Sequence, residues 1–327
     1  MVKGVKNNLA LKSRLTQLLF QTCYRMKSFY RKYGLTTPIL DRTVFRTLHN
    51  LLGGRLELAF VGGAYISEEN EEFANICFGN FHQGYGLTET CSAVLLTDLN
   101  CLATGSAGRP LSHCELKLFP WDEGNCDPND PNDPRGEIAI CGDCITLGYY
   151  KNKELTDSSY ITDTSTGKRW FLTGDIAVKT SNGNFKIVDR KKDIIKLLHG
   201  EYVSLSKIES VVGKNLLIDI ICIAPNKEMS YLVALIIPNR GKIMKFLMEN
   251  NYTEPNADIE DLIKDSKITA KIRTEIENFA KKQLNRYEFP KYFHVLTDIW
   301  TPENNMITPT IKLKRTEISK RYSHLLN

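Results

Sequence analysis

The stretch "GDIAVKTSNGNFKIVDRKKDIIKLLHGEY", residues 174–202, contains both a hairpin signal and a domain junction. Two runs of alternating apolar and polar residues flank "SNGN", and an Asn-Gly turn between such runs predicts a β-hairpin. After Arg190 the pattern changes to short strands and helices, as in "LIDIICIAP", "YLVALII" and the helical text from about 240 to 285. Because this alternation is typical of a small α+β domain, we predict one over residues 192–327.

The residues before the hairpin predict a larger α/β unit. "RLELAFVGGAYIS" (55–67) predicts a buried strand that ends in a glycine turn, and Ser67 is a suitable N-cap for the acidic helix that follows. "CELKLF" (114–119) and "GEIAICG" (136–142) predict short strands around a Pro/Asn/Asp-rich loop. We therefore expect residues 1–110 to form part of an α/β lobe and residues 111–191 to form its β-rich subdomain.

Composition limits the class of protein. The chain has 327 residues, which is enough for two or three domains with cores of their own. Its nine cysteines are scattered at irregular spacing, which indicates reduced thiols in a cytosol-facing protein. The net charge of +5 is mild and does not indicate nucleic-acid binding. The sequence shows no secretory signal, and its apolar runs are too short to cross a bilayer.

The first forty residues are basic, and no acidic residue occurs before Asp41. Apolar residues recur in them at helical spacing: Leu11, Leu15, Leu18, Leu19, Met26, Phe29, Tyr30 and Tyr33. We expect this stripe to pack on a protein core, as most such stripes do. The alternative is a basic amphipathic helix on an anionic membrane, which would place the protein peripherally on the cytoplasmic face of the endoplasmic reticulum or another membrane.

A second stretch, "HQGYGLTETCSAVL" (82–95), has the residue types of a nucleotide site. The glycines beside Tyr85 let the backbone turn sharply near a ligand, and the tyrosine ring can stack on a base. Thr88 can donate its hydroxyl to a phosphate oxygen, and Glu89 is a hard ligand suited to Mg²⁺. Glycine turns are also common for backbone reasons alone, so this stretch by itself is compatible with a purely structural turn as well.

Two further positions fit the same ligand. "WFLTGD" (170–175) ends on Asp175, whose carboxylate can accept hydrogen bonds from both hydroxyls of a ribose. Arg190 can bind ribose and phosphate oxygens with its fork, and Lys192 lies at the predicted junction. The alternatives are an aspartate that starts a tight turn and a solvated run of charges.

Five blocks, in this order, make the chain resemble the adenylate-forming acyl-CoA synthetases, and among them the long-chain fatty acyl-CoA synthetases. They are "LLGGRLELAFVGGAYIS", "GYGLTET", "RGEIAICG" with "LGYY", "TGDIA" through "GEYVSLSKIE", and "ENNMITPTIKLKR". The resemblance implies an α/β fold, the C-terminal part of the adenylate-forming fold: a partial large lobe with a small β-barrel and a small α+β lobe. It also implies a fatty acid–CoA ligase that uses ATP, Mg²⁺ and coenzyme A.

The resemblance assigns nucleotide roles residue by residue. Tyr85 matches the residue that stacks on adenine, Thr88 the α-phosphate contact and Glu89 the magnesium ligand. Asp175 and Arg190 match the ribose contacts.

Other matches concern the acyl group, coenzyme A and domain movement. Gly62, Gly63 and Ala64 resemble the turn beside the adenine and acyl groups. Lys192 falls on the hinge about which the small domain rotates. Gly200 resembles the glycine that lets the pantetheine arm of coenzyme A pass close to the backbone.

Lys312 matches the lysine that bridges the fatty carboxylate and the α-phosphate. The glycine that usually precedes this lysine is missing, which leaves Lys314 as the alternative. The implied reaction has two steps: the carboxylate attacks the α-phosphate to give acyl-adenylate and pyrophosphate, and the coenzyme A thiolate then displaces AMP.

Members of this family are about twice as long, and their N-terminal half carries a Ser/Thr/Gly-rich loop for the β- and γ-phosphates. "TDTSTGKRW" (162–170) is not expected to replace that loop, because Thr162 and Arg169 break the Walker pattern. We expect exposed apolar surface where the missing half would pack. Two other functions stay open: a non-catalytic nucleotide- or acyl-CoA-binding remnant, and a membrane-surface interaction protein.

Overall fold

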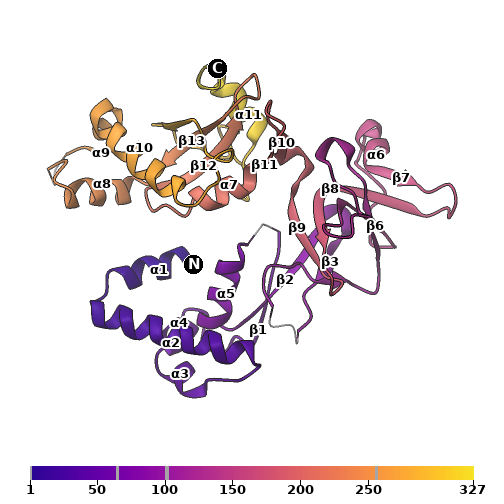
Figure 1. The fold of residues 1–327 in the computed structure, drawn as a ribbon, viewed down its shortest axis with the longest axis horizontal. Helices are drawn as coiled ribbons and strands as arrows, with labels where there is room; N and C mark the ends of the chain where they lie inside the picture. Colours follow the sequence, from indigo (N-terminus) through magenta and orange to yellow (C-terminus); the bar gives the residue numbers. More distant parts are fainter. Residues whose placement is uncertain (1, 64–65, 100–102, 255–256) are drawn as a thin grey trace. The chain divides into compact units, whose positions relative to one another are not determined.

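The computed structural model describes residues 2–63, 66–99, 103–254 and 257–327 (Figure 1). The chain forms two compact units, Met1–Lys191 and Lys192–Asn327. Each unit has its own cores. In the described ranges, no helix combines the length and the apolar character needed to cross a bilayer.

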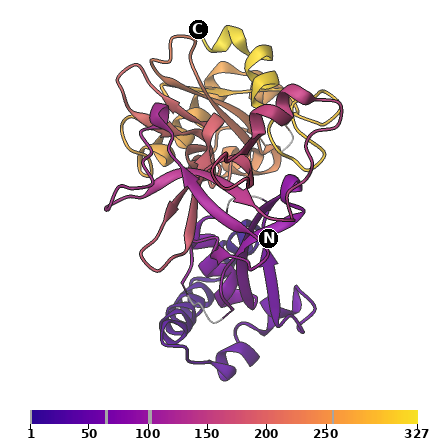
Figure 2. The same ribbon diagram turned by 90° about the vertical axis from the view of Figure 1, so that its right-hand side faces the viewer.

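The N-terminal part of the first unit is a cluster of helices. These are α1 (Val2–Ala10), α2 (Arg14–Lys32), α3 (Pro38–Arg42), α4 (Arg46–Asn50) and α5 (Glu68–Cys77). Their shared core includes Phe45, Phe73 and Ile76. Ser67 caps α5 as predicted, since its hydroxyl accepts a hydrogen bond from the Asn70 amide. Figures 1 and 2 both show these helices gathered beside β1 and β2.

The apolar stripe of α2 does not pack on a core, so the favoured prediction for it is wrong. Its residues are all exposed, from 40% for Met26 to 77% for Leu15. A second set of residues, Phe20, Cys23 and Tyr24, packs into the core beside α5 instead. These three have the i, i+3, i+4 spacing of one helical face, so the helix has two apolar faces and only one is covered. We call the exposed stripe the outer α2 face; it consists of Leu15, Leu18, Leu19, Met26, Phe29 and Tyr30 of the helix, with Leu11 and Tyr33 flanking it.

A four-stranded sheet follows these helices, in the order β1-β2-β3-β4. Its strands are β1 (Leu58–Val61), β2 (Asn80–Leu87), β3 (Ser92–Leu96) and β4 (Arg109–Pro110). β1 and β2 are parallel, and the other neighbours are antiparallel. The prediction of a buried strand at β1 is wrong in its burial: Leu58 and Phe60 are 39% and 55% exposed. The reason is that β1, among the described residues, pairs with β2 alone and forms the edge of the sheet.

The β-rich part of the first unit is an open five-stranded sheet, in the order β5-β6-β8-β7, with β9 also paired to β8. Its elements are β5 (Glu115–Phe119), β6 (Arg135–Cys141), α6 (Lys153–Ser159), β7 (Tyr160–Thr162), β8 (Arg169–Lys179) and β9 (Phe185–Arg190). β8 and β9 form the predicted hairpin. The expected small barrel does not close among the described residues, because β7 and β9 share one edge of β8 and β5 pairs only with β6.

The second unit packs a three-stranded sheet between two layers of side chains. The three strands of this sheet are β12 (Ile218–Pro225), β13 (Leu232–Pro238) and β14 (Tyr292–Val295), while β10 (Ile194–Lys196) and β11 (Tyr202–Ser204) form a separate two-stranded sheet. The helices of the unit are α7 (Leu205–Val212), α8 (Arg240–Glu249), α9 (Ile259–Lys264), α10 (Ser266–Lys281) and α11 (Arg315–Arg321). In the described parts of both units, the chain also forms four 3-10 turns: η1 (Thr88–Thr90), η2 (Asp122–Gly124), η3 (Lys191–Asp193) and η4 (Ser323–Leu325).

β13 is buried along its whole length and lies between β12 and β14. Its alternate residues Leu232, Ala234 and Ile236 pack with α7, α8 and α10. The residues between them pack with Trp300 and with Ile318 of α11. A strand covered on both faces requires a continuous apolar run, which is why "YLVALII" is so regular.

Candidate nucleotide-binding site

Three of the predicted site residues meet at one point of the first unit. The Tyr85 hydroxyl donates a hydrogen bond to Asp175 Oδ2 at 2.6 Å. Arg190 Nε lies 3.5 Å from the other carboxylate oxygen, Asp175 Oδ1. Asp175 is only 5% exposed, whereas the Arg190 side chain is 56% exposed. The result is a buried carboxylate with an aromatic ring on one side and a solvent-accessible guanidinium on the other.

The strands explain how residues so distant in sequence come together. Asp175 on β8 and Arg190 on β9 are paired residues of the predicted hairpin. Tyr85 lies on β2, in the neighbouring sheet, and its ring packs partly against the core that β6 and β8 share. Burial and the Asp175 carboxylate raise the pKa of Tyr85 well above its usual value. The hydroxyl therefore keeps its proton and acts as a fixed donor.

A second layer of contacts fixes the backbone at Asp175. Gly174 has a φ of 71°, a conformation that favours glycine. Its amide donates to Glu137 Oε1 at 3.0 Å, and Lys191 Nζ lies 3.2 Å from the other oxygen of the same carboxylate. Glu137 thus connects the turn before Asp175 to the residue after Arg190.

Thr88 and Glu89 lie in η1, directly after β2. The Tyr149 hydroxyl donates to Glu89 Oε1 at 2.7 Å, and the Thr146 amide donates to the Glu89 carbonyl at 2.8 Å. Burial, with the Glu89 carboxylate, raises the pKa of Tyr149 to about 12. Thr88 is exposed at the end of the strand. The neutral Tyr149 hydroxyl therefore orients the Glu89 carboxylate, and the Thr146 amide fixes the backbone of the same residue.

Glu89 fits a magnesium ion that is shared with a ligand. The described residues contain no group of three or more side chains that could hold a metal without help. Mg²⁺ commonly takes one or two protein carboxylates and completes its shell with water and phosphate oxygens. A single oriented carboxylate beside a hydroxyl suits that arrangement and does not suit an all-protein metal cage.

The glycines of "VGG" lie where β1 ends beside the Tyr85 segment. A side chain at Gly62 would place its Cβ 2.9 Å from the Gly84 carbonyl, so only glycine allows this approach. Gly63 has a φ of 80° and turns the chain away from the strand. Ala64, which was predicted to belong to the same turn, lies outside the described residues.

The remaining predicted positions belong to the second unit. Lys192 is exposed in η3 at the unit boundary. Gly200 has a φ of 89° in the turn between β10 and β11, where its amide donates to the Leu197 carbonyl at 2.8 Å. Lys312 is exposed in a tight loop over residues 306–314, and the Lys314 ammonium donates to Asn305 Oδ1.

That loop is held by its own hydrogen bonds. The Thr308 amide donates to the Lys312 carbonyl at 2.8 Å, and the Lys312 amide donates to Thr308 Oγ1 at 3.0 Å. The Lys314 amide donates to the Met306 carbonyl at 2.9 Å. Lys312 is therefore presented to solvent on an ordered loop, while Lys314 is already engaged.

Sequence reasoning gave no role to three residues that the structure places around the site. Tyr149, Glu137 and Lys191 orient Glu89 and Asp175. Their only signal was position: Tyr149 is in "LGYY" and Glu137 is in "GEIAICG", both of which belong to the blocks that carry the resemblance. The rejected segment "TDTSTGKRW" joins β7 to β8 as a turn in which Asp163 accepts a hydrogen bond from the Ser165 amide.

Comparison with protein families and curated proteins gives a consistent result. Residues 14–150 match the model of the AMP-binding enzymes. The chain is 34% identical over 333 residues to long chain acyl-CoA synthetase 8 of Arabidopsis thaliana, with 99% of this chain and 46% of the relative covered. It is 30% identical over 325 residues to fatty acyl-CoA synthetase B of Dictyostelium discoideum, with 98% and 47% covered. The chain thus spans about half the length of the curated relatives it matches.

Solved structures show the same likeness in three dimensions. The A domain of carboxylic acid reductase from Segniliparus rugosus, in complex with AMP and a co-purified carboxylic acid, matches with a TM-score of 0.67 at 26% identity. That match covers 94% of this chain and 45% of the domain. The adenylation domain of a carboxylate reductase from Mycobacterium chelonae matches with a TM-score of 0.65 at 27% identity, over 96% of this chain and 45% of that one.

Proposed function

Because residues 14–150 match the model of the AMP-binding enzymes and the relatives include long-chain acyl-CoA synthetases, we propose that this chain is an AMP-binding enzyme that activates long-chain fatty acids for transfer to coenzyme A. ATP, a fatty acid and coenzyme A would be its substrates. The observation that supports this proposal most directly is the buried Asp175 carboxylate, held between Tyr85 and Arg190 in a chain whose relatives include long-chain acyl-CoA synthetases. The chain spans about half the length of those relatives. The complete reaction would therefore require this chain together with the other half of the fold that those relatives have.

The residues of the first unit would bind and orient the nucleotide. Asp175 would accept hydrogen bonds from the ribose hydroxyls, and Arg190 would contact ribose and phosphate oxygens. The Tyr85 ring would stack on adenine while its hydroxyl keeps Asp175 in place. Thr88 would donate to the α-phosphate. A magnesium ion held by Glu89 would offset the negative charge of the phosphates.

The reaction would then have two steps, adenylation of the fatty acid and transfer of the acyl group to coenzyme A. A fatty carboxylate attacks the α-phosphorus, the bond to the β-phosphate oxygen breaks, and pyrophosphate leaves. Lys312 would stabilise the negative charge on the oxygens around the phosphorus. In the second step the thiolate of coenzyme A attacks the acyl carbon and AMP leaves. Lys192 would be the pivot that changes the orientation of the second unit between the steps, and Gly200 would leave room for the pantetheine arm.

Lys312→Ala should lower the rate of fatty-acid-dependent ATP–pyrophosphate exchange roughly tenfold to 100-fold, because it removes one charge-assisted contact to the reacting phosphate. The measurement is isotope exchange between pyrophosphate and ATP with a long-chain fatty acid present.

Lys314→Ala is the matched control. The Lys314 ammonium donates to Asn305, directly before the loop, so removing this side chain should leave the exchange rate within a factor of about two. If Lys314→Ala lowered the ATP–pyrophosphate exchange rate more than Lys312→Ala, Lys314 would be the lysine that contacts the reacting phosphate. AMP binding with no exchange, even when the remaining half of the fold is supplied, would favour the alternative of a non-catalytic nucleotide-binding remnant.

The outer α2 face supports a second proposal, contact with an anionic membrane. Its leucines and aromatics are exposed, and Arg14, Arg25 and Lys32 on the same helix are exposed as well. Exposed apolar area of this kind marks an interaction surface, and the basic residues suit anionic lipid headgroups. The protein would then be peripheral on the cytoplasmic face of the endoplasmic reticulum or another membrane.

Leu15→Asp should weaken binding to vesicles of phosphatidylcholine with phosphatidylserine at least about tenfold, since one buried leucine contributes roughly 1.5–3 kcal/mol. Flotation of the protein with such vesicles measures this, and added salt should lower binding further. Leu147→Asp is the control, because Leu147 is 93% exposed but lies outside the outer α2 face. Equal binding of Leu15→Asp and the native chain would contradict the proposal, and would favour packing of this face against protein.

A further inference from the structure

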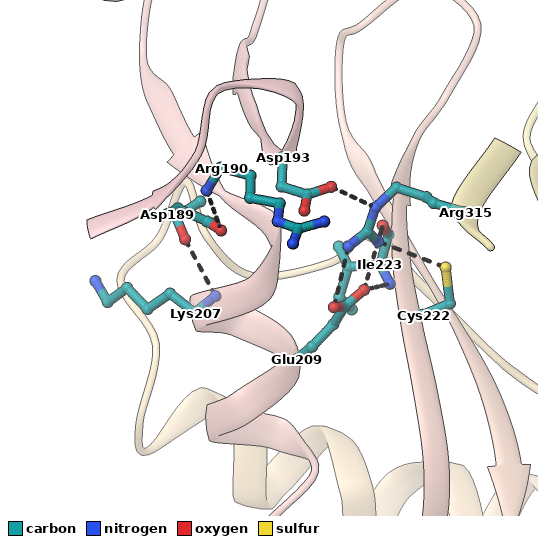
Figure 3. A network of polar contacts seen from close by, with 9 residues as sticks. Asp189, Arg190, Asp193, Lys207, Glu209, Cys222, Ile223 and Arg315 are labelled. Atoms are coloured by element: carbon teal, nitrogen blue, oxygen red, sulfur yellow. Dashed lines mark hydrogen bonds and ion pairs between the residues drawn. The ribbon is translucent and has the colours of Figure 1, made fainter. Parts of the chain in front are cut away.

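The second unit contains a buried cluster of charges that the nucleotide contacts do not use. Its centre is the Arg315 guanidinium, which Figure 3 shows surrounded by Asp193, Glu209, Cys222 and Ile223. The side chains of Arg315, Glu209 and Asp193 are only 19%, 12% and 22% exposed.

Arg315 uses its whole fork. Nη1 and Nη2 lie 2.5 Å and 3.1 Å from the two oxygens of Glu209, and Nε donates to Asp193 Oδ1 at 3.0 Å. Nη1 also donates to the carbonyl of Ile223 at 2.7 Å. Four acceptor oxygens from three residues match the planar guanidinium, whereas a lysine ammonium has a different geometry and reach.

The cluster joins segments that lie far apart in the chain. Asp193 follows Lys192 directly at the start of the unit, and Arg315 follows directly after the loop 306–314 that carries Lys312. Glu209 belongs to α7 and Ile223 to β12, so the two segments are attached to the sheet and to the helix beside it. The Arg315 side chain, on the first residue after the proposed catalytic loop, therefore bonds directly to the residue that follows the proposed pivot.

Attachment of α11 to the unit does not require this charge. Ile318 and Tyr322 are buried in the core on one face of the sheet. Burying an ion pair costs desolvation energy, and apolar replacements of such pairs are often neutral or stabilising. Burial raises the pKa of Glu209, because desolvation disfavours the ionised carboxylate. The Arg315 guanidinium offsets part of that increase. A charged clamp at this position needs a reason other than holding the helix.

We propose that Arg315 is a positioning residue, which fixes the loop 306–314 relative to the segment that follows Lys192. The proposal rests on the function proposed above, where a lysine on this loop serves a site that the pivot brings into place. A reacting group has to be held within a fraction of an ångström to be effective. A rigid link between pivot and loop would let the movement of one determine the position of the other.

Asp193→Asn tests this link without removing a core residue. This change weakens the contact between Arg315 Nε and residue 193. We therefore expect the amides of Thr308, Lys312 and Lys314 to exchange with solvent about three- to tenfold faster. The amides of β13 should keep their native exchange rates. Site-resolved hydrogen exchange on the full chain measures both sets, and it needs neither nucleotide nor activity.

Asp219→Asn is the matched control, since Asp219 is an exposed aspartate of β12 outside the cluster. A second variant, Arg315→Met with Glu209→Met, removes both buried charges together and should give faster loop exchange while β13 stays protected. Arg315→Lys keeps the charge but not the fork, so its loop amides should exchange faster than in the native chain and more slowly than in the double variant. Native loop exchange in both Asp193→Asn and the double variant would overturn the proposal. Absence of ATP–pyrophosphate exchange would count against the proposed function alone, because the link is measured without it.

Discussion

Replacing Asp175 with alanine is expected to weaken AMP binding roughly 100-fold, the effect of losing two charge-assisted hydrogen bonds of about 1.5 kcal/mol each. The carboxylate is buried and already oriented by Tyr85 at 2.6 Å and Arg190 at 3.5 Å, so no reorganisation offsets its loss. Isothermal titration calorimetry with AMP measures the affinity. If a folded Asp175→Ala protein bound AMP with unchanged affinity, Asp175 would not be a nucleotide contact.

Two variants separate binding from folding in this experiment. Asp175→Asn keeps an acceptor for the Tyr85 hydroxyl but loses the charge, so it should retain native stability better than the alanine variant while still losing affinity. Asp157→Ala removes an exposed carboxylate that pairs with Lys153 on α6. It should leave both AMP affinity and stability close to native, because exposed ion pairs contribute little.

Glu209→Ala is expected to lower the free energy of unfolding of the second unit by about 3–5 kcal/mol, because it leaves the Arg315 guanidinium buried without its main partner. The same change also frees the Ile223 amide, which donates to Glu209 Oε1 at 2.7 Å. Native-state hydrogen exchange of the β12 and β13 amides reports this free energy directly, since these strands are the core of the unit.

Glu317→Ala is the corresponding control on α11, where Glu317 forms an exposed pair with Lys320 at 3.1 Å. We expect a change within about 0.5 kcal/mol. If Glu209→Ala destabilised the unit no more than Glu317→Ala, the clamp around Arg315 would be a surface contact rather than a buried one.

Local patterns predicted much of the architecture. The Asn-Gly turn identified the β8–β9 hairpin, which pairs Asp175 with Arg190, and the apolar run at β13 identified a central strand. Both features depend on residues that are neighbours in sequence or in one hairpin. Such features can be predicted because strand alternation and turn chemistry act over a few residues.

Long-range contacts could not be predicted in the same way. Helical spacing in α2 is compatible with either of two apolar faces, and only the position of α5 determines which one is covered. The Tyr149–Glu89 contact spans 60 residues and the Arg315–Asp193 contact spans 122. Neither leaves a periodic signal, since the partners meet only after separate strands and helices have packed.

The free edge of β1 has a practical consequence for anyone who handles this chain. A parallel strand with open backbone groups beside an exposed Phe60 is a template for pairing with another copy. We therefore expect concentrated samples to self-associate through this edge, so that the monomer fraction falls as the protein is concentrated. Titrations and rate measurements should therefore be compared at one dilute concentration, or made on a Phe60→Lys variant whose charge discourages stacking.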